Sequence, residues 1–151
     1  LFWLMGDLSN TQRVHVLGLV VLLIPSLVLI GIFSKPMNLL QMGKDTASSL
    51  GVNVRAVSLT LLGVSSLLVS GTVCLVGLVG FVGLVIPHIL RLIMGPDHRT
   101  LVPACILGGA AFMTGCDLLA RTLPAQGEMP VGVVTALIGA PLFVYLLSRS
   151  S

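Results

Sequence analysis

The chain has 151 residues, of which 56% are hydrophobic and 9% are charged, and its formal net charge is +3. Soluble domains carry about 25% charged residues, and disordered chains combine low hydrophobicity with many charges, so this composition argues against both classes. The eight Lys and Arg residues are scattered along the sequence, which also argues against a nucleic-acid-binding surface. The sequence therefore predicts a protein embedded in a lipid bilayer.

The start of the chain does not predict a secretory signal peptide. It begins Leu1-Phe2-Trp3, without an initiator Met, and no basic segment precedes a short apolar core. A processed protein and a piece of a longer chain are both open at this point.

The first apolar run, Val14–Phe33, is long enough to cross a bilayer, which takes about 20 residues. The polar segment 34–55 follows it. Apolar residues recur there at helical spacing, and Gly43 and Gly51 punctuate the pattern. This spacing predicts two short amphipathic helices that each end at a glycine.

The next apolar stretch, Ala56–Met94, is interrupted only by His88 and Arg91. One helix of that length would extend about 58 Å, which is too long for a single crossing of a bilayer core about 30 Å thick. We expect two spans, with the break in the series Gly77, Gly80 and Gly83.

The remainder of the chain predicts two further spans. Residues 95–99 form a turn by composition, and the run Leu101–Cys116 follows, a little short for a crossing. Residues 117–128 are polar, and Met129–Leu147 is the last apolar run. The expected fold is thus an all-α, polytopic bundle of about five membrane-crossing helices.

The basic residues indicate how this bundle is oriented, because cytoplasmic loops are enriched in Lys and Arg. If the crossings alternate, Arg13 and Arg121 lie on the outer side with Asp7, Asp117 and Glu128. The C-terminus and the more basic loops then lie in the cytoplasm. Their basic residues are Lys35, Lys44, Arg55, Arg91, Arg99 and Arg149.

Several residues have both a structural and a functional interpretation. The glycines at 77, 80 and 83 fit ordinary close helix packing, or a re-entry turn beside a transport path. His88 fits a solvated position near the membrane interface better than proton or metal chemistry. Arg121 fits either an exposed interfacial charge or a salt bridge to an external protein.

No catalytic or metal-binding pattern emerges from the sequence. There is no G-x-S-x-G or H-E-x-x-H motif, and Gly43-Lys44-Asp45-Thr46 lacks the remaining residues of a nucleotide-binding loop. Cys74, Cys105 and Cys116 form no Cys-x-x-Cys pair, and we expect them to pack as small apolar residues. The sequence predicts neither an enzyme nor a metal site.

A long motif, Gly80-Phe81-Val82-Gly83-Leu84-Val85-Ile86-Pro87-His88-Ile89-Leu90-Arg91, resembles the hallmark of FecCD-type ABC-importer permeases for iron–siderophore, haem and cobalamin. Collinear matches follow at 95–103, 117–121, 128–135 and 139–143. Upstream, Lys35-Pro36-Met37-Asn38 and Leu50-Gly51 resemble the family's cytoplasmic coupling region, and Trp3-Leu4-Met5-Gly6 resembles its outer segment. The resemblance covers essentially the whole chain as one part of a single permease domain.

The resemblance implies a role for each segment. Family permeases have about ten helices, so the chain corresponds to their C-terminal half and lacks the gate helix. The segment 34–55 would be the coupling region, Arg121 would face an external substrate-binding protein, and the helix from Gly80 and the last span would flank the pathway. The implied ATPase-coupling residues are Pro36, Met37, Asn38, Leu39, Leu40, Met42, Gly43, Ala47, Leu50 and Gly51, and the implied pathway or helix-packing residues are Gly80, Gly83, Pro87, Gly132, Thr135, Gly139 and Pro141.

The implied partners are an ATP-binding subunit that carries ATP and Mg, an extracytoplasmic substrate-binding protein, a second copy of the permease and the lipid of a bacterial inner membrane. No cofactor is expected on this chain itself. The alternatives are an intramembrane enzyme, for which no convincing residues are found, and a truncated membrane scaffold or pseudogene-like fragment that does not transport. The identity of the chelate stays open.

Overall fold

The computed structural model describes residue 6 and residues 12–123 and 129–150, and these ranges contain helices and no strand. The predicted outer residues Trp3, Leu4, Met5, Asp7 and Glu128 lie outside them. In chain order the helices are α1 (Arg13–Ile32), α2 (Ser34–Gln41), α3 (Lys44–Ser49), α4 (Val54–Val76), α5 (Val82–Met94), α6 (His98–Thr122) and α7 (Val131–Ser150).

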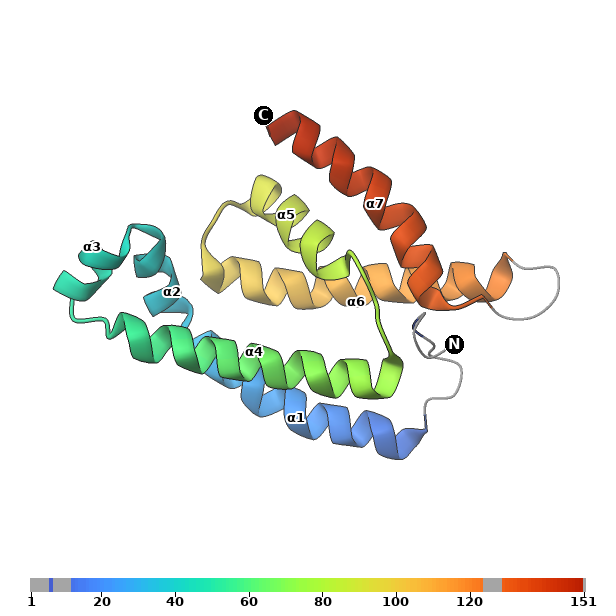
Figure 1. Ribbon diagram of the computed structural model, residues 1–151, viewed down its shortest axis with the longest axis horizontal. Coiled ribbons are helices and arrows are strands. Elements are labelled where there is room, and N and C mark those ends of the chain that lie inside the picture. The colour runs from blue at the N-terminus through green and yellow to red at the C-terminus, as the bar shows by residue number, and fades with distance from the viewer. Residues whose placement is uncertain (1–5, 7–11, 124–128, 151) are drawn as a thin grey trace.

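The long helices form two groups. Helix α1 packs against α4, and α5, α6 and α7 pack against one another (Figure 1). Direct contact between the long helices of the two groups is sparse. The short helix α2 contacts α1 and α4 on one side and α6 on the other, so it bridges the two groups.

Within the part of the chain that the structure describes, four helices are long and apolar enough to cross a membrane: α1, α4, α6 and α7. Helix α5 has 13 residues and extends about 20 Å, which is shorter than the bilayer core of about 30 Å. In place of the expected five crossings, the described residues contain four long apolar helices and one short apolar helix. The reason is local, since residues 77–81 of the apolar run are not helical.

The predicted break between α4 and α5 is confirmed. Helix α4 ends at Val76, and Gly77 has a φ of 84°, which favours glycine. Phe81, directly before α5, has a φ of 67°, a left-handed conformation that is uncommon for any residue other than glycine. The chain thus turns sharply on both sides of residues 78–80.

Helix α6 is longer at both ends than the predicted span Leu101–Cys116. The Asp97 side chain caps its N-terminus by accepting a hydrogen bond from the Arg99 backbone N–H at 3.0 Å. At the other end Asp117 and Arg121 pair four residues apart, which supports further helical turns. Asp117 and Arg121, which we expected in the polar segment between two spans, therefore lie on the last turns of a helix.

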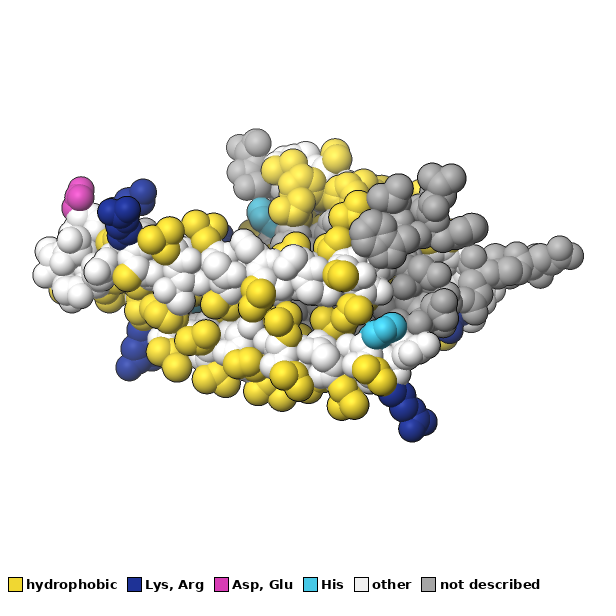
Figure 2. Space-filling view, turned by 60° about the horizontal axis from the view of Figure 1, so that its bottom comes forward, with side chains coloured by type: hydrophobic (Ala, Val, Ile, Leu, Met, Phe, Trp, Pro, Cys, Tyr) yellow, Lys and Arg dark blue, Asp and Glu magenta, His cyan; other side chains and the backbone are white. Residues whose placement is uncertain are grey.

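Apolar side chains cover the outside of the structure. Figure 2 shows them along the face formed by α1 and α4, with charged side chains towards its ends. Val14 and Val21 on α1 are each 73% exposed, and many other large apolar side chains are similarly open. Exposed apolar faces of this extent are typical of surfaces that meet lipid or further protein. The buried core is small and lies between α6 and α7, at Cys116, Ala120, Val131 and Val134.

Candidate functional site

Helices α2 and α3 form a two-helix element at one end of the long helices, beside the turn between α5 and α6 (Figure 1). Gly43 separates the two helices with a φ of 112°, and Gly51 follows α3 with a φ of 83°. Both φ values favour glycine, so the two glycines fix where the helices end. The predicted pair of short helices with glycine stops is confirmed.

The residues expected to couple to an ATP-binding subunit differ in exposure. Met42 and Leu50 are 69% and 60% exposed, so they present apolar surface outward. Ala47, by contrast, is fully buried. Gly43 and Gly51 are exposed in the bends, and the remaining expected residues are half-buried: Pro36, Met37, Asn38, Leu39 and Leu40.

A polar contact joins α2 to the start of α6. Asn38 Nδ2 donates a hydrogen bond to Asp97 Oδ1 at 2.6 Å, and Asn38 Oδ1 accepts one from the His98 backbone N–H at 2.9 Å. Gln41 Nε2 donates to the carbonyl oxygen of Pro96 at 3.0 Å. We call Asn38, Gln41, Asp97 and His98 the α2–α6 clamp.

The His98 ring completes this clamp. Its Nδ1 lies 2.8 Å from Asn38 Oδ1 and 3.0 Å from Gln41 Nε2. With a proton on Nδ1 the ring donates to Asn38, and without one it accepts from Gln41. Either tautomer therefore links α6 to α2.

Asp97 is charged in this setting. The Arg99 backbone N–H and the Asn38 amide both donate hydrogen bonds to its carboxylate, and they lower the pKa of Asp97 below its usual 3.8. The carboxylate therefore stays ionised at neutral pH, where it acts both as a helix cap and as the acceptor for Asn38.

Two cavities flank the clamp. One of about 400 Å³ is lined by Met37, Leu40, Gln41, Leu61, Arg91, Pro96 and His98. The other, of about 300 Å³, is lined by Leu27, Gly31, Ser34, His98, Arg99, Val102, Pro103 and Ile106. His98 lines both pockets, and both are open to the outside of the structure, so the hydrogen-bonded contact lies between two surface pockets.

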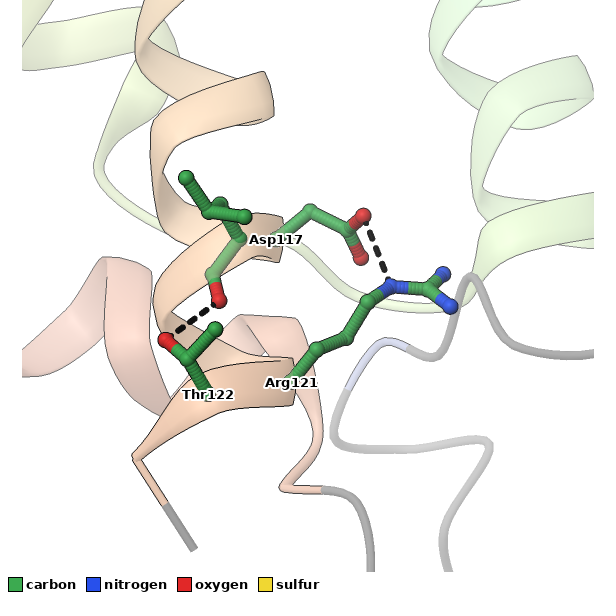
Figure 3. A network of polar contacts seen from close by, with 4 residues as sticks. Asp117, Arg121 and Thr122 are labelled. Carbon is green, nitrogen blue, oxygen red and sulfur yellow. Dashed lines mark hydrogen bonds and ion pairs between the residues drawn. The ribbon is translucent and has the colours of Figure 1, made fainter.

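Arg121, the expected docking residue, lies near the opposite end of α6. Its Nε donates to Asp117 Oδ2 at 2.9 Å, and Figure 3 shows the two side chains along one side of the helix. The Arg121 side chain is 45% exposed. Asp117 thus holds the Nε of Arg121 on a side chain that is partly exposed.

The expected pathway and packing residues occupy contrasting surroundings. A Cβ atom on Gly139 would lie 2.4 Å from Phe81 Cβ, so α7 can approach the turn before α5 because residue 139 has no side chain. Thr135 is fully buried, and its Oγ1 donates to the Gly132 carbonyl at 3.0 Å. Gly80 and Gly83 have open space where a Cβ would be built. Pro87 and Pro141 lie inside α5 and α7.

Several contact residues did not emerge from the sequence. A Cβ on Gly71 would lie 3.0 Å from Leu22, and one on Gly108 would lie 3.3 Å from Ile86 and Leu90. Gly71 and Gly108 thus permit close approach within the two helix groups. Small residues in apolar runs were the available signal, but spacing alone does not show which helix each one meets.

The burial of His88 and of the cysteines differs in part from what the sequence predicts. We expected His88 to be solvated, but its Nε2 is buried and has no hydrogen-bond partner among the described residues. Cys116 is buried, Cys105 is half-buried and Cys74 is exposed, so only part of the expected burial holds. The described ranges bring together no group of three His, Cys, Asp or Glu residues that could hold a metal ion.

Comparison with known proteins decides the family. Residues 1–149 match the FecCD transport family. The chain belongs to this family. It is 44% identical over 147 residues to the hemin transport system permease protein HmuU of Yersinia pestis, covering 97% of this chain and 44% of HmuU. It is 41% identical over 150 residues to the vitamin B12 import system permease protein BtuC of Klebsiella pneumoniae, covering 99% of this chain and 45% of BtuC.

A solved structure shares the fold of this FecCD chain. It is described as an inward-facing conformation of a metal-chelate type ABC transporter, and the match has a TM-score of 0.92 at 35% identity. The match covers 98% of this chain and 48% of the solved one. The chain therefore spans less than half the length of the relatives it matches, and its fold is that of part of a membrane permease of the ABC transporter class.

Proposed function

We propose that this FecCD chain is the C-terminal half of a permease subunit that imports an iron–siderophore, haem or cobalamin-type chelate. A separate ATP-binding subunit, which carries ATP and Mg, supplies the energy. The observation that carries the proposal is the family match over residues 1–149, combined with a two-helix element beside the membrane helices. The missing half and a second permease copy complete the translocation path, which lies between the two copies.

The α2–α3 element is the proposed contact for the ATP-binding subunit. It presents Met42 and Leu50, two large apolar side chains, at an end of the molecule that also carries Lys35, Lys44 and Arg55. An excess of basic residues marks cytoplasmic loops. This end, with the C-terminus, therefore faces the cytoplasm of a bacterial inner membrane, where ATP is available.

The opposite end is the proposed contact for an extracytoplasmic substrate-binding protein. Arg121 lies there, with a partly exposed guanidinium that Asp117 orients. A planar guanidinium suits paired recognition of a carboxylate on another protein. We assign the docking role to Arg121 on this basis.

The test of the proposal is binding of the ATP-binding subunit to the full-length protein that contains these residues, purified in detergent. Met42→Asp combined with Leu50→Asp should weaken that binding at least tenfold, because two charges would replace the apolar contact surface. Titration with a labelled ATP-binding subunit measures the affinity.

The matched control is Leu123→Asp, at the opposite end of α6, where the leucine is 66% exposed. This control should leave the affinity for the ATP-binding subunit within twofold of wild type. Equal affinity in the double variant and the wild type would overturn the coupling role of α2–α3.

A further inference from the structure

The two helix groups meet chiefly through α2. This helix contacts α1 and α4 in the first group and α6 in the second, whereas the long helices of the two groups barely touch. A displacement of α2–α3 can therefore reach α5, α6 and α7 through two routes: the contact between α2 and α6, and the covalent link along 77–81.

Hydrogen bonds between residues far apart in the sequence cross the contact between α2 and α6. The clamp residues join the two helices through Asn38 to Asp97 and His98, and through Gln41 to Pro96 and His98. Cavities of about 400 Å³ and about 300 Å³ lie on its two sides. Hydrogen bonds depend on distance and direction, so these bonds set the register of α2 on α6.

We propose that Asn38, Gln41, Asp97 and His98 are positioning residues that make α6 follow α2 when the ATP-binding subunit moves the α2–α3 element. The inference rests on the proposed function. With the clamp intact, α2 moves as one unit with the first turn of α6, and α5 and α7 follow because they pack on α6. Without the clamp, the open pockets on both sides leave α2 free to move over α6, and ATP is hydrolysed without a matching movement of α6.

The His98 ring suits this role because it has two partners on α2. Asn38 Oδ1 and Gln41 Nε2 lie within 3.0 Å of the same nitrogen, on residues three apart. A small shift of α2 along α6 can exchange one partner for the other if the ring proton moves from Nδ1 to Nε2, because Asn38 Oδ1 accepts and Gln41 Nε2 donates. The clamp can therefore hold through a change of register that a steric contact would block.

The test uses the full-length protein reconstituted in lipid vesicles with its ATP-binding subunit and substrate-binding protein. Asn38→Asp places a second carboxylate against Asp97 and removes the amide donor. We expect the number of chelate molecules imported per ATP hydrolysed to fall at least fivefold. Because the import is expressed per ATP hydrolysed, the readout does not depend on how much ATP-binding subunit is bound.

The exchanged pair gives the sharpest readout. In Asn38→Asp combined with Asp97→Asn, an amide and a carboxylate face each other again with their positions reversed, and Asn still caps α6. This double variant should restore the import ratio to within twofold of wild type. Asn53→Asp is the matched control, since it makes the same substitution at the cap of α4, where the side chain accepts from the Ala56 N–H.

Gln41→Ala provides a milder variant if Asn38→Asp fails to assemble, and it should lower the import ratio two- to threefold. A wild-type ratio in the assembled Asn38→Asp or Gln41→Ala protein would overturn the clamp. The clamp would also be overturned if Asn38→Asp lowered the import ratio and the added Asp97→Asn substitution failed to restore it. Failure of the proposed function is distinguishable, because the wild type itself would then show no ATP-driven import.

Discussion

The two routes between the helix groups, the α2–α6 clamp and the link along 77–81 that ends at Phe81, are built differently. At the α2–α6 clamp, polar side chains meet across distant parts of the sequence, and cavities flank them. Between α5 and α7, Phe81 in a left-handed conformation rests on Gly139, with no room for a Cβ. Hydrogen bonds can exchange partners while remaining satisfied, but a close steric contact cannot. The comparison identifies the first site as adjustable and the second as fixed.

The largest effect is expected at the fixed site. Gly139→Ala would place a methyl group 2.4 Å from Phe81 Cβ, so α7 or the 77–81 turn would have to shift. Overpacking of this kind costs about 1–3 kcal/mol. The thermal unfolding temperature of the full-length protein in detergent should fall by several degrees.

The control for that variant is Gly83→Ala, which lies on α5 with open space around the new methyl group. Alanine favours a helix over glycine by up to about 1 kcal/mol, so this change should leave the unfolding temperature equal or higher. Equal unfolding temperatures for both variants would contradict the steric account of Gly139.

A smaller effect is expected at the adjustable site. Asp97→Ala removes the cap of α6 together with the acceptor for Asn38, and loss of a helix cap costs about 1 kcal/mol. Asp97→Asn keeps an oxygen for the cap and should lose less than half as much. Urea unfolding of the purified protein compares the two, and an equal loss in both would show that the charge, not the cap, matters there.

The smallest effect on the fold is expected at Arg121, where the ion pair with Asp117 is partly exposed and local. Exposed pairs of this type contribute about 0.3–0.5 kcal/mol. Arg121→Glu should therefore leave unfolding nearly unchanged while weakening docking of the substrate-binding protein about tenfold at low salt, because the charge is reversed. Docking affinity that stays at the wild-type value across a salt series would remove the role of Arg121.

The sequence predicted the features that depend on local composition. The apolar runs, the glycine break after Val76 and the two short helices around Gly43 all follow from hydropathy and from φ values that favour glycine. The length of α5 did not follow, because composition does not show how many residues of an apolar run a turn consumes. The ends of α6 were misplaced because Asp97 and Asp117 resemble loop residues until their hydrogen-bond partners are known.

The candidate site was predicted in the same uneven way. Asn38 and the turn 95–99 each stood out in the sequence, but nothing in the spacing placed them together, since the contact joins residues about 60 positions apart. For the same reason, neither Gln41 nor His98, which lies within that turn, was assigned to a contact. The turn 95–99 was present in the sequence as part of a family motif without an assigned role. Only the packing of α2 on α6 shows that this turn contacts Asn38 and Gln41.

The central claim is that this chain is half of an ATP-driven chelate permease, and its most direct test is uptake. The full-length protein containing residues 1–151 would be reconstituted in vesicles with its ATP-binding subunit and its substrate-binding protein. Accumulation of haem, cobalamin and a ferric siderophore would be measured with ATP or ADP. The account predicts accumulation of at least one chelate with ATP and none with ADP. Equal accumulation with ATP and ADP, or none for any of the three while the ATP-binding subunit remains bound, would contradict it.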